Sequence, residues 1–140
     1  MKTLVVEDDF TSRLLLQEIL KKYGDVHIAV NGQEAVKAVD TAINTGEPYN
    51  LICLDIMMPE MNGLEALKKI RGMEDARGIQ ITRGVKVIMT TALDGAKHIM
   101  EAFHGLCDAY LVKPIDKPAL IKQMHRLGLI GGPAKPAENA

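Results

Sequence analysis

The chain has 140 residues, of which 47% are hydrophobic and 25% are charged, and its net charge is −1 at pH 7. A chain of this length is expected to fold as one domain with a single core, since there is no room for a second domain of ordinary size. The scattered and nearly balanced charges exclude the concentrated basic face that binds nucleic-acid phosphates, so no direct nucleic-acid partner is expected.

Neither the cysteines nor the N-terminus indicates a secreted or membrane protein. Cys53 and Cys107 each lie in an apolar stretch, and no close Cys or His spacing resembles a metal site, so both are expected to be buried, reduced thiols. Acidic residues begin at Glu7, too early for a signal peptide, and no apolar stretch approaches the roughly 20 residues of a membrane span. We therefore expect a cytoplasmic protein with no membrane partner.

The order of the expected elements predicts the fold class. Short apolar runs indicate strands, and longer segments with apolar residues three or four apart indicate helices. In chain order, these patterns predict a strand over residues 3–6, a helix over 10–22, a strand over 26–30, a helix with its apolar face at 35–39, a strand over 51–54, a helix over 64–72, a strand over 85–91, a helix over 94–104, a strand over 107–114 and a helix over 116–127. Because parallel neighbours need a crossover and helices supply it, this alternation predicts an α/β fold with a five-stranded parallel sheet.

Local signals mark the ends of several helices. Gly24 and Gly72 stand where the first and third helices are expected to stop. Asn31 and Asp116 are expected to cap the second and last helices. Asp9 is interpreted as the cap of the first helix and not as a metal ligand.

Two segments fall outside this alternation. Residues 73–84 mix charges with glycine and predict a longish surface loop. The Gly, Pro and Ala residues from 131 onward predict a polar, disordered tail. The expected organisation is one domain over residues 1–129 and a disordered tail over 130–140.

The most informative stretch surrounds Asp55. Four apolar residues in a row, 51–54, lead into this carboxylate, and Asn62-Gly63 follows as part of a turn. Continuous apolar runs are typical of strands in a parallel sheet that is covered on both faces. Ligands of such sheets bind in the crevice outside the carboxyl ends of the strands, and Asp55 is expected at that edge.

Polar side chains follow four of the predicted strands at this same edge. They are Glu7 and Asp8 after the first strand, Asp55 after the third, Thr91 at the end of the fourth and Lys113 at the end of the fifth. Three carboxylates close together repel one another unless a cation lies among them, and Mg²⁺ binds through such oxygens. The Lys113 amine and the Thr91 hydroxyl would complete a site for the oxygens of a transferred phosphoryl group.

These residues and their neighbours resemble the receiver domain of two-component response regulators, and most closely a stand-alone, chemotaxis-type receiver. The resemblance covers about residues 2–128 and rests on several motifs in order, namely Leu4-Val5-Val6-Glu7-Asp8, Asp55 with Met57-Met58-Pro59-Glu60-Met61-Asn62-Gly63 after it, Thr91-Ala92, and Tyr110-Leu111-Val112-Lys113-Pro114. It implies the flavodoxin-like (βα)5 fold, a doubly wound sandwich whose parallel sheet has the order 2-1-3-4-5.

The resemblance also implies the chemistry. Asp55 would accept a phosphoryl group from a phosphohistidine on a sensor histidine kinase or a histidine phosphotransfer protein. Asp8 and Asp55 would bind Mg²⁺ or Mn²⁺ directly, the backbone carbonyl of Met57 would be the third protein ligand, and Glu7 would act through water. The protein would be a phosphoacceptor that assists its own phosphorylation and dephosphorylation, and not a turnover enzyme.

A conformational switch is implied as well. Thr91 would move to bond the phosphoryl oxygens, Lys113 would pair with them, and Tyr110 would turn inward as the switch aromatic. The face built by the fourth helix, fifth strand and fifth helix would then bind an unidentified downstream protein, with the chain a monomer or a phosphorylation-dependent dimer. Met57 and Leu93 stand at positions that tune acyl phosphate lifetime in this family, and their apolar side chains predict slow spontaneous dephosphorylation.

Other functions stay open at this point. The chain could be the receiver fragment of a larger, for example DNA-binding, regulator, or a pseudo-receiver that signals without phosphorylation, although no chemical residue is missing. A phosphatase of the haloacid dehalogenase type is disfavoured because Asp55-Ile56-Met57 lacks a second acid and follows the third strand. A flavodoxin is disfavoured because the turn after the first strand is acidic.

Overall fold

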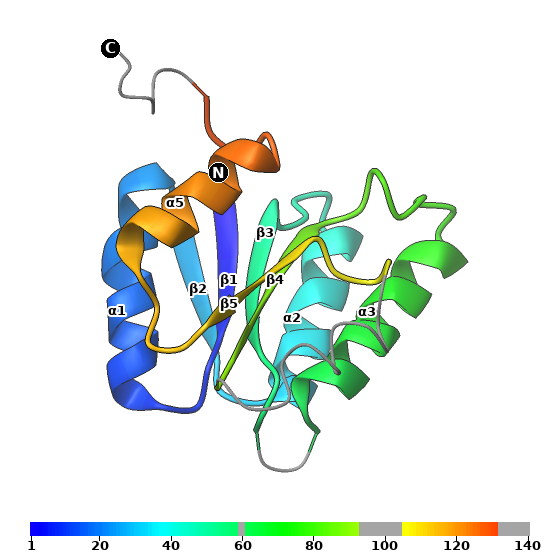
Figure 1. Cartoon of the computed structure of the whole chain (residues 1–140). Helices are drawn as coiled ribbons and strands as arrows, with labels where there is room; N and C mark the ends of the chain where they lie inside the picture. The colour runs from blue at the N-terminus through cyan, green and yellow to red at the C-terminus, as the bar shows by residue number, and fades with distance from the viewer. Residues whose placement is uncertain (59–60, 93–104, 132–140) are drawn as a thin grey trace.

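Five parallel strands form one sheet in the order β2-β1-β3-β4-β5 (Figure 1). The structure is a computed structural model that describes residues 1–58, 61–92 and 105–131. The strands are β1 (Lys2–Val6), β2 (Asp25–Ala29), β3 (Leu51–Asp55), β4 (Lys86–Thr91) and β5 (Ala109–Val112). This is the predicted flavodoxin-like order, in which β1 and β3 lie at the centre of the sheet beside each other.

Helices cover both faces of the sheet (Figure 1). They are α1 (Phe10–Leu20), which continues as a short 3-10 helix η1 (Lys21–Tyr23), α2 (Gly32–Asn44), α3 (Gly63–Ala76) and α5 (Lys117–Arg126). Helices α2 and α3 pack together on one face, and α1 and α5 lie on the other. Among the described helices, none is long and apolar enough to cross a membrane.

The core consists of two aliphatic clusters, one on each face of the sheet. Along β1, Leu4 and Val6 pack against α2 and α3, whereas Val5 packs against α1 and α5. All five residues of β3 are buried, because this central strand has helices above and below it. Burial on both faces of the sheet therefore explains the continuous apolar run before Asp55, as the sequence predicted.

Side-chain caps fix where the helices begin. Asp9 accepts a hydrogen bond from the backbone N–H of Ser12 at 2.9 Å, which confirms its predicted role as the cap of α1. Asn31 and Asp116 cap α2 and α5 in the same way, as predicted. The Asn62 side chain caps α3 with a reciprocal capping box that the sequence analysis did not identify.

One helix end was predicted wrongly. α3 does not stop near Gly72 but continues to Ala76, so part of the predicted 73–84 loop is helical. The extra turn carries Glu74, whose carboxylate is buried and bonds to the Arg71 guanidinium and to the Val85 backbone N–H. These tertiary contacts stabilise the helix beyond a glycine that local propensity alone would treat as a stop.

Several predicted boundaries shift by one or two residues, and some predictions lie outside the described residues. The second strand covers 25–29 instead of 26–30, and the fifth is shorter than the predicted 107–114. Cys53 is fully buried as predicted, whereas Cys107 is only partly buried. The helix predicted over 94–104 and most of the predicted tail fall outside the described part of the chain.

Candidate functional site

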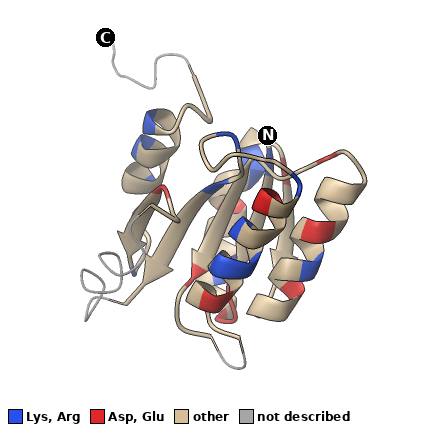
Figure 2. Ribbon diagram, turned by 90° about the vertical axis from the view of Figure 1, so that its right-hand side faces the viewer, with Lys and Arg blue, Asp and Glu red and all other residues tan. Residues whose placement is uncertain are grey.

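Parallel register brings the predicted site residues to one edge of the sheet. Val6 of β1 is level with Leu54 of β3, so Glu7 follows β1 at the height where Asp55 ends β3. Thr91 ends β4, and its carbonyl oxygen accepts a 2.7 Å hydrogen bond from the backbone N–H of Lys113. Figure 2 shows acidic residues at these carboxyl ends of the strands.

Lys113 joins two of the carboxylates directly. Its Nζ atom lies 2.7 Å from Oε1 of Glu7 and 3.3 Å from Oδ2 of Asp55. Glu7 is fully buried, and only 3% of Asp55 is exposed. One ammonium therefore partly compensates two buried carboxylates that approach each other at the end of the central strands.

The protonation of the site follows from burial and charge. Burial and the nearby Glu7 carboxylate raise the pKa of Asp55 to about 7, although Lys113 acts in the opposite direction. For Lys113, burial acts to lower the pKa, but its contacts with Glu7 and Asp55 outweigh this and raise it. The site is thus short of positive charge in the absence of a further cation.

A third carboxylate completes an acidic group that could hold a metal ion. Glu7, Asp8 and Asp55 each offer an oxygen, and these oxygens lie within 4.8 Å of one another. Asp8 is exposed, whereas the other two are buried, so the group opens to solvent on the side of Asp8. All the donors are hard carboxylate oxygens close to one another, so the group fits Mg²⁺ or Mn²⁺.

Backbone hydrogen bonds hold Met57 and Gly63 close to the end of β3. The Met57 backbone N–H donates to Oδ1 of Asp55 at 3.2 Å, and the Gly63 N–H donates to the Ile56 carbonyl oxygen at 2.9 Å. A Cβ atom at Gly63 would overlap the backbone carbonyl of Asp55. The glycine thus allows the first turn of α3 to pack directly against the end of β3.

Thr91 and Tyr110, two further predicted residues, lie on neighbouring strands. Thr91 is buried at the end of β4 beside Asp55 and its partner Thr90. Tyr110, on β5, is 41% exposed and pairs in register with Met89. Met57 follows β3 two residues after Asp55, and its side chain is 68% exposed.

Sequence reasoning missed a positioning contact from α1. The Arg13 guanidinium donates to the Glu7 carbonyl oxygen at 3.2 Å. Its Cζ atom lies over the Phe10 ring, 5.5 Å from the ring centroid. The Asp9 backbone N–H also donates to Oε2 of Glu7, at 3.1 Å. Arg13 stands one helical turn after the Asp9 cap, and that spacing is the signal by which the contact could have been found.

The chain is similar to known proteins over most of its length. The model of the response regulator receiver domain family matches residues 3–125. Chemotaxis protein CheY1 of Helicobacter pylori is 34% identical over 125 residues, which cover 88% of this chain and 92% of CheY1. Osmosensing histidine protein kinase SLN1 of Saccharomyces cerevisiae is 32% identical over 122 residues, which cover 86% of this chain but only 9% of SLN1.

A solved structure is similar over nearly the whole chain. It is the receiver domain of the histidine kinase CKI1 from Arabidopsis thaliana, complexed with Mg²⁺ and BeF₃⁻. The two chains are 29% identical, with a TM-score of 0.75, and the match covers 91% of this chain and 89% of the other. The match therefore extends over most of the chain.

Proposed function

The chain belongs to the response regulator receiver domain family of two-component systems, and from this premise we propose that Asp55 is its phosphoacceptor. The donor would be a phosphohistidine on a sensor histidine kinase or a histidine phosphotransfer protein. The observation that carries the proposal is the placement of Asp55, which lies 3.3 Å from the Lys113 ammonium and within the acidic group of Glu7 and Asp8.

The divalent cation would be held by Asp8 and Asp55 directly, by the Met57 carbonyl, and by Glu7 through water. In the similar CKI1 receiver, Mg²⁺ is present together with BeF₃⁻, which supports the same cation here. When bound, such an ion neutralises charge on the carboxylates and on the incoming phosphoryl oxygens. The cation would also favour the ionised, nucleophilic form of Asp55, whose pKa burial raises to about 7.

Each step of phosphoryl transfer can be assigned to a group at the site. An oxygen of the Asp55 carboxylate attacks phosphorus in line with the leaving imidazole, a new O–P bond forms, and the N–P bond breaks with its electron pair left on nitrogen. The Lys113 ammonium stabilises charge on the phosphoryl oxygens, and the Thr91 hydroxyl donates a hydrogen bond to one of them. Catalysis here is positioning and electrostatic stabilisation, so the chain acts as a self-assisting phosphoacceptor and not as a turnover enzyme.

The output would be binding of a downstream protein. The Lys113 backbone N–H donates to the Thr91 carbonyl oxygen, so movement of Thr91 toward a phosphoryl group would displace the end of β5. Tyr110 lies on that strand and is 41% exposed in this structure, which leaves it free to turn inward. The face that includes β5 and α5 is therefore proposed as the phosphorylation-dependent surface for the partner, or for a second copy of the chain.

The decisive experiment is the intact mass of the protein after incubation with acetyl phosphate, with and without Mg²⁺. The wild type should gain one phosphoryl group only with Mg²⁺, and Asp55→Asn should gain none. Asp9→Asn is the matched control, because asparagine also caps helices and Asp9 is not proposed as a ligand. It should be phosphorylated like the wild type, whereas Asp8→Asn should need far more Mg²⁺.

Two results would contradict the proposal. If Asp55→Asn still gains a phosphoryl group, the acceptor is another residue. If the wild type gains none from acetyl phosphate or from a phosphorylated histidine phosphotransfer protein, the chain signals as a pseudo-receiver through binding alone.

A further inference from the structure

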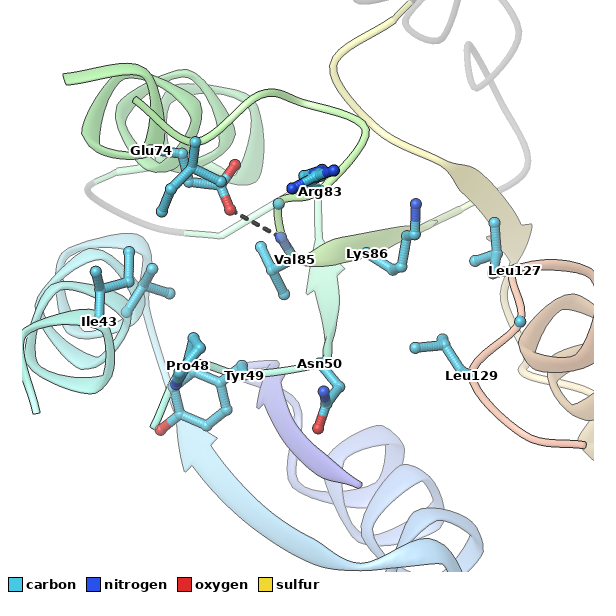
Figure 3. Close-up of a pocket in the computed structure, with 14 residues that line it drawn as sticks. Ile43, Pro48, Tyr49, Asn50, Glu74, Arg83, Val85, Lys86, Leu127 and Leu129 are labelled. Carbon is cyan, nitrogen blue, oxygen red and sulfur yellow. Dashed lines mark hydrogen bonds between the residues drawn. The ribbon is translucent and has the colours of Figure 1, made fainter. Parts of the chain in front are cut away.

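A cavity of about 310 Å³ lies at the end of the sheet opposite Asp55 (Figure 3). Its walls come from the last turns of α2 and α3, the segments that precede β3 and β4, and the turn that follows α5. Asp55 is the last residue of β3, and Asn50, in the cavity wall, directly precedes the first. The whole length of β3 therefore separates the cavity from the acidic edge. An occupant of the cavity would leave the acidic edge open.

Two walls of the cavity are apolar. Ile43, Pro48 and Tyr49 lie on one side, and Leu127 and Leu129 lie on the opposite side in Figure 3. Tyr49 is almost completely buried, so its ring is a fixed part of the wall. Apolar walls with a few polar groups, and volumes from roughly 300 Å³ upward, are typical of sites for small molecules.

The acid that lines the cavity is already paired with an arginine. Glu74 is 3% exposed, and its Oε1 atom accepts from Nη1 of Arg71 at 2.8 Å. Its Oε2 atom accepts from the backbone N–H of Val85 at 2.8 Å, the bond drawn in Figure 3. Arg71 therefore neutralises the only carboxylate among the residues that line the cavity in the described chain.

Two basic side chains in the wall are less well compensated. Within residues 1–58, 61–92 and 105–131, the Arg83 side chain makes no ion pair or hydrogen bond. Lys86 Nζ lies 4.0 Å from Oδ1 of Asp108, at the limit of an ion pair. Asp108 is already shared, since its Oδ2 atom accepts from the Val87 N–H at 2.8 Å and lies 3.3 Å from Nη2 of Arg71.

We propose that this cavity binds a small carboxylate with an apolar body. The carboxylate would meet the guanidinium of Arg83, whose planar fork matches two carboxylate oxygens, with Lys86 as a second cation. The apolar body would lie between Tyr49 and Leu129. Charge selects the anion and the walls select an apolar chain, so both parts of the ligand are needed for binding.

Three probes separate the contribution of the carboxylate to binding from that of the apolar body. Octanoate carries both a carboxylate and an apolar chain, acetate carries the carboxylate alone, and 1-octanol carries the chain alone. Each would be titrated into the ¹⁵N-labelled full chain and followed by amide chemical shifts. Octanoate should shift the signals of Gly84, Val85 and Gly128, with an affinity at least about tenfold higher than that of either other probe.

Variants identify the proposed cation. Arg83→Gln should weaken octanoate binding about tenfold, because one charge-assisted contact is lost. Lys122→Gln is the matched control, since this exposed lysine on α5 does not line the cavity and its loss should change nothing. Asp55→Asn should bind octanoate like the wild type, so the result does not depend on the phosphoacceptor proposal.

Three outcomes would overturn the inference. They are a shift confined to amides outside the cavity wall, binding of 1-octanol as tight as that of octanoate, and equal weakening of binding by Arg83→Gln and Lys122→Gln. The first would place the site elsewhere. The second would show that the carboxylate does not contribute to binding. The third would show that binding depends only on the net charge of the protein.

Discussion

Lys113 Nζ lies 2.7 Å from Oε1 of Glu7, and the Glu7 carboxylate is fully buried. Removing one partner of such a pair leaves an uncompensated buried charge, which is more damaging than removing both. We predict that Lys113→Met lowers the free energy of unfolding by about 3 kcal/mol. Adding Glu7→Gln to Lys113→Met should restore part of that loss.

Urea unfolding of the wild type, both single variants and the double variant measures this coupling as a double-mutant cycle. The double variant should be less destabilised than the sum of the single variants. Additive losses would show that the two side chains stabilise the fold independently, in spite of their 2.7 Å contact.

Asp55 should make the stability depend on pH. Burial, with the Glu7 carboxylate, raises its pKa from 3.8 to about 7, so the folded state holds the proton more tightly than the unfolded chain does. Its contribution to stability is fully present below about pH 4 and is lost as the pH rises through about 7. In chelator-treated protein, the unfolding free energy should fall over this range, and it should fall less in Asp55→Asn.

The same titration predicts how Mg²⁺ binding responds to pH. A divalent cation binds the ionised carboxylate, so the proton at Asp55 competes with it. Isothermal titration should show affinity for Mg²⁺ weakening by up to about tenfold per pH unit below pH 7. An affinity that stays constant between pH 5.5 and pH 8 would exclude Asp55 as a titrating ligand.

Two glycines of α3 should respond oppositely to alanine. A Cβ atom at Gly63 would overlap the Asp55 carbonyl, so Gly63→Ala should lower the unfolding free energy by about 2 kcal/mol or more. Around Gly72 no atom lies within 4 Å of the added Cβ, so Gly72→Ala should raise it by about 0.5–1 kcal/mol. Thermal unfolding of both variants tests this, and equal effects would contradict the close packing at Gly63.

A buried ion pair near the end of α3 should contribute more to stability than an exposed one. Arg71 is 8% exposed and bonds to Glu74, to the Leu106 carbonyl and to the Val85 carbonyl, each at 2.8 Å. Arg71→Met should therefore cost about 3 kcal/mol of stability because the buried Glu74 carboxylate loses its counter-charge.

Arg77, the C-cap residue of the same helix, provides the matched comparison. It pairs with Asp40, but the two side chains are 30% and 45% exposed. Arg77→Met should lower the unfolding free energy by less than about 1 kcal/mol. Equal losses in guanidinium unfolding of the two variants would show that burial of the Arg71 pair does not matter.

Met57 should prolong the lifetime of the acyl phosphate. Its exposed thioether stands two residues after Asp55 and cannot hold an attacking water by hydrogen bonds as an amide would. Met57→Asn should speed spontaneous dephosphorylation about tenfold, the equivalent of one hydrogen bond in the transition state. Met57→Leu is the control and should leave the rate unchanged, and loss from the wild type within seconds would contradict the prediction.

The sequence by itself determined the order of the described elements and the residue types at the acidic edge. Apolar runs, helical spacing and caps such as Asp9 and Asn31 act locally, so they could be identified without knowing the fold. The alternation of strands and helices then required a parallel sheet, and a parallel sheet brings the ends of its strands to one edge. Glu7 and Asp55 could be placed together for that reason.

Only the tertiary structure decided which of these groups are in direct contact and how strongly they interact. The pairing of Lys113 with Glu7 depends on distances between strands far apart in sequence, and the raised pKa of Asp55 depends on burial by helices on both faces of the sheet. The extra turn of α3 likewise depends on Glu74 reaching Val85 across the fold. These features arise from packing, and packing joins residues that no local pattern relates.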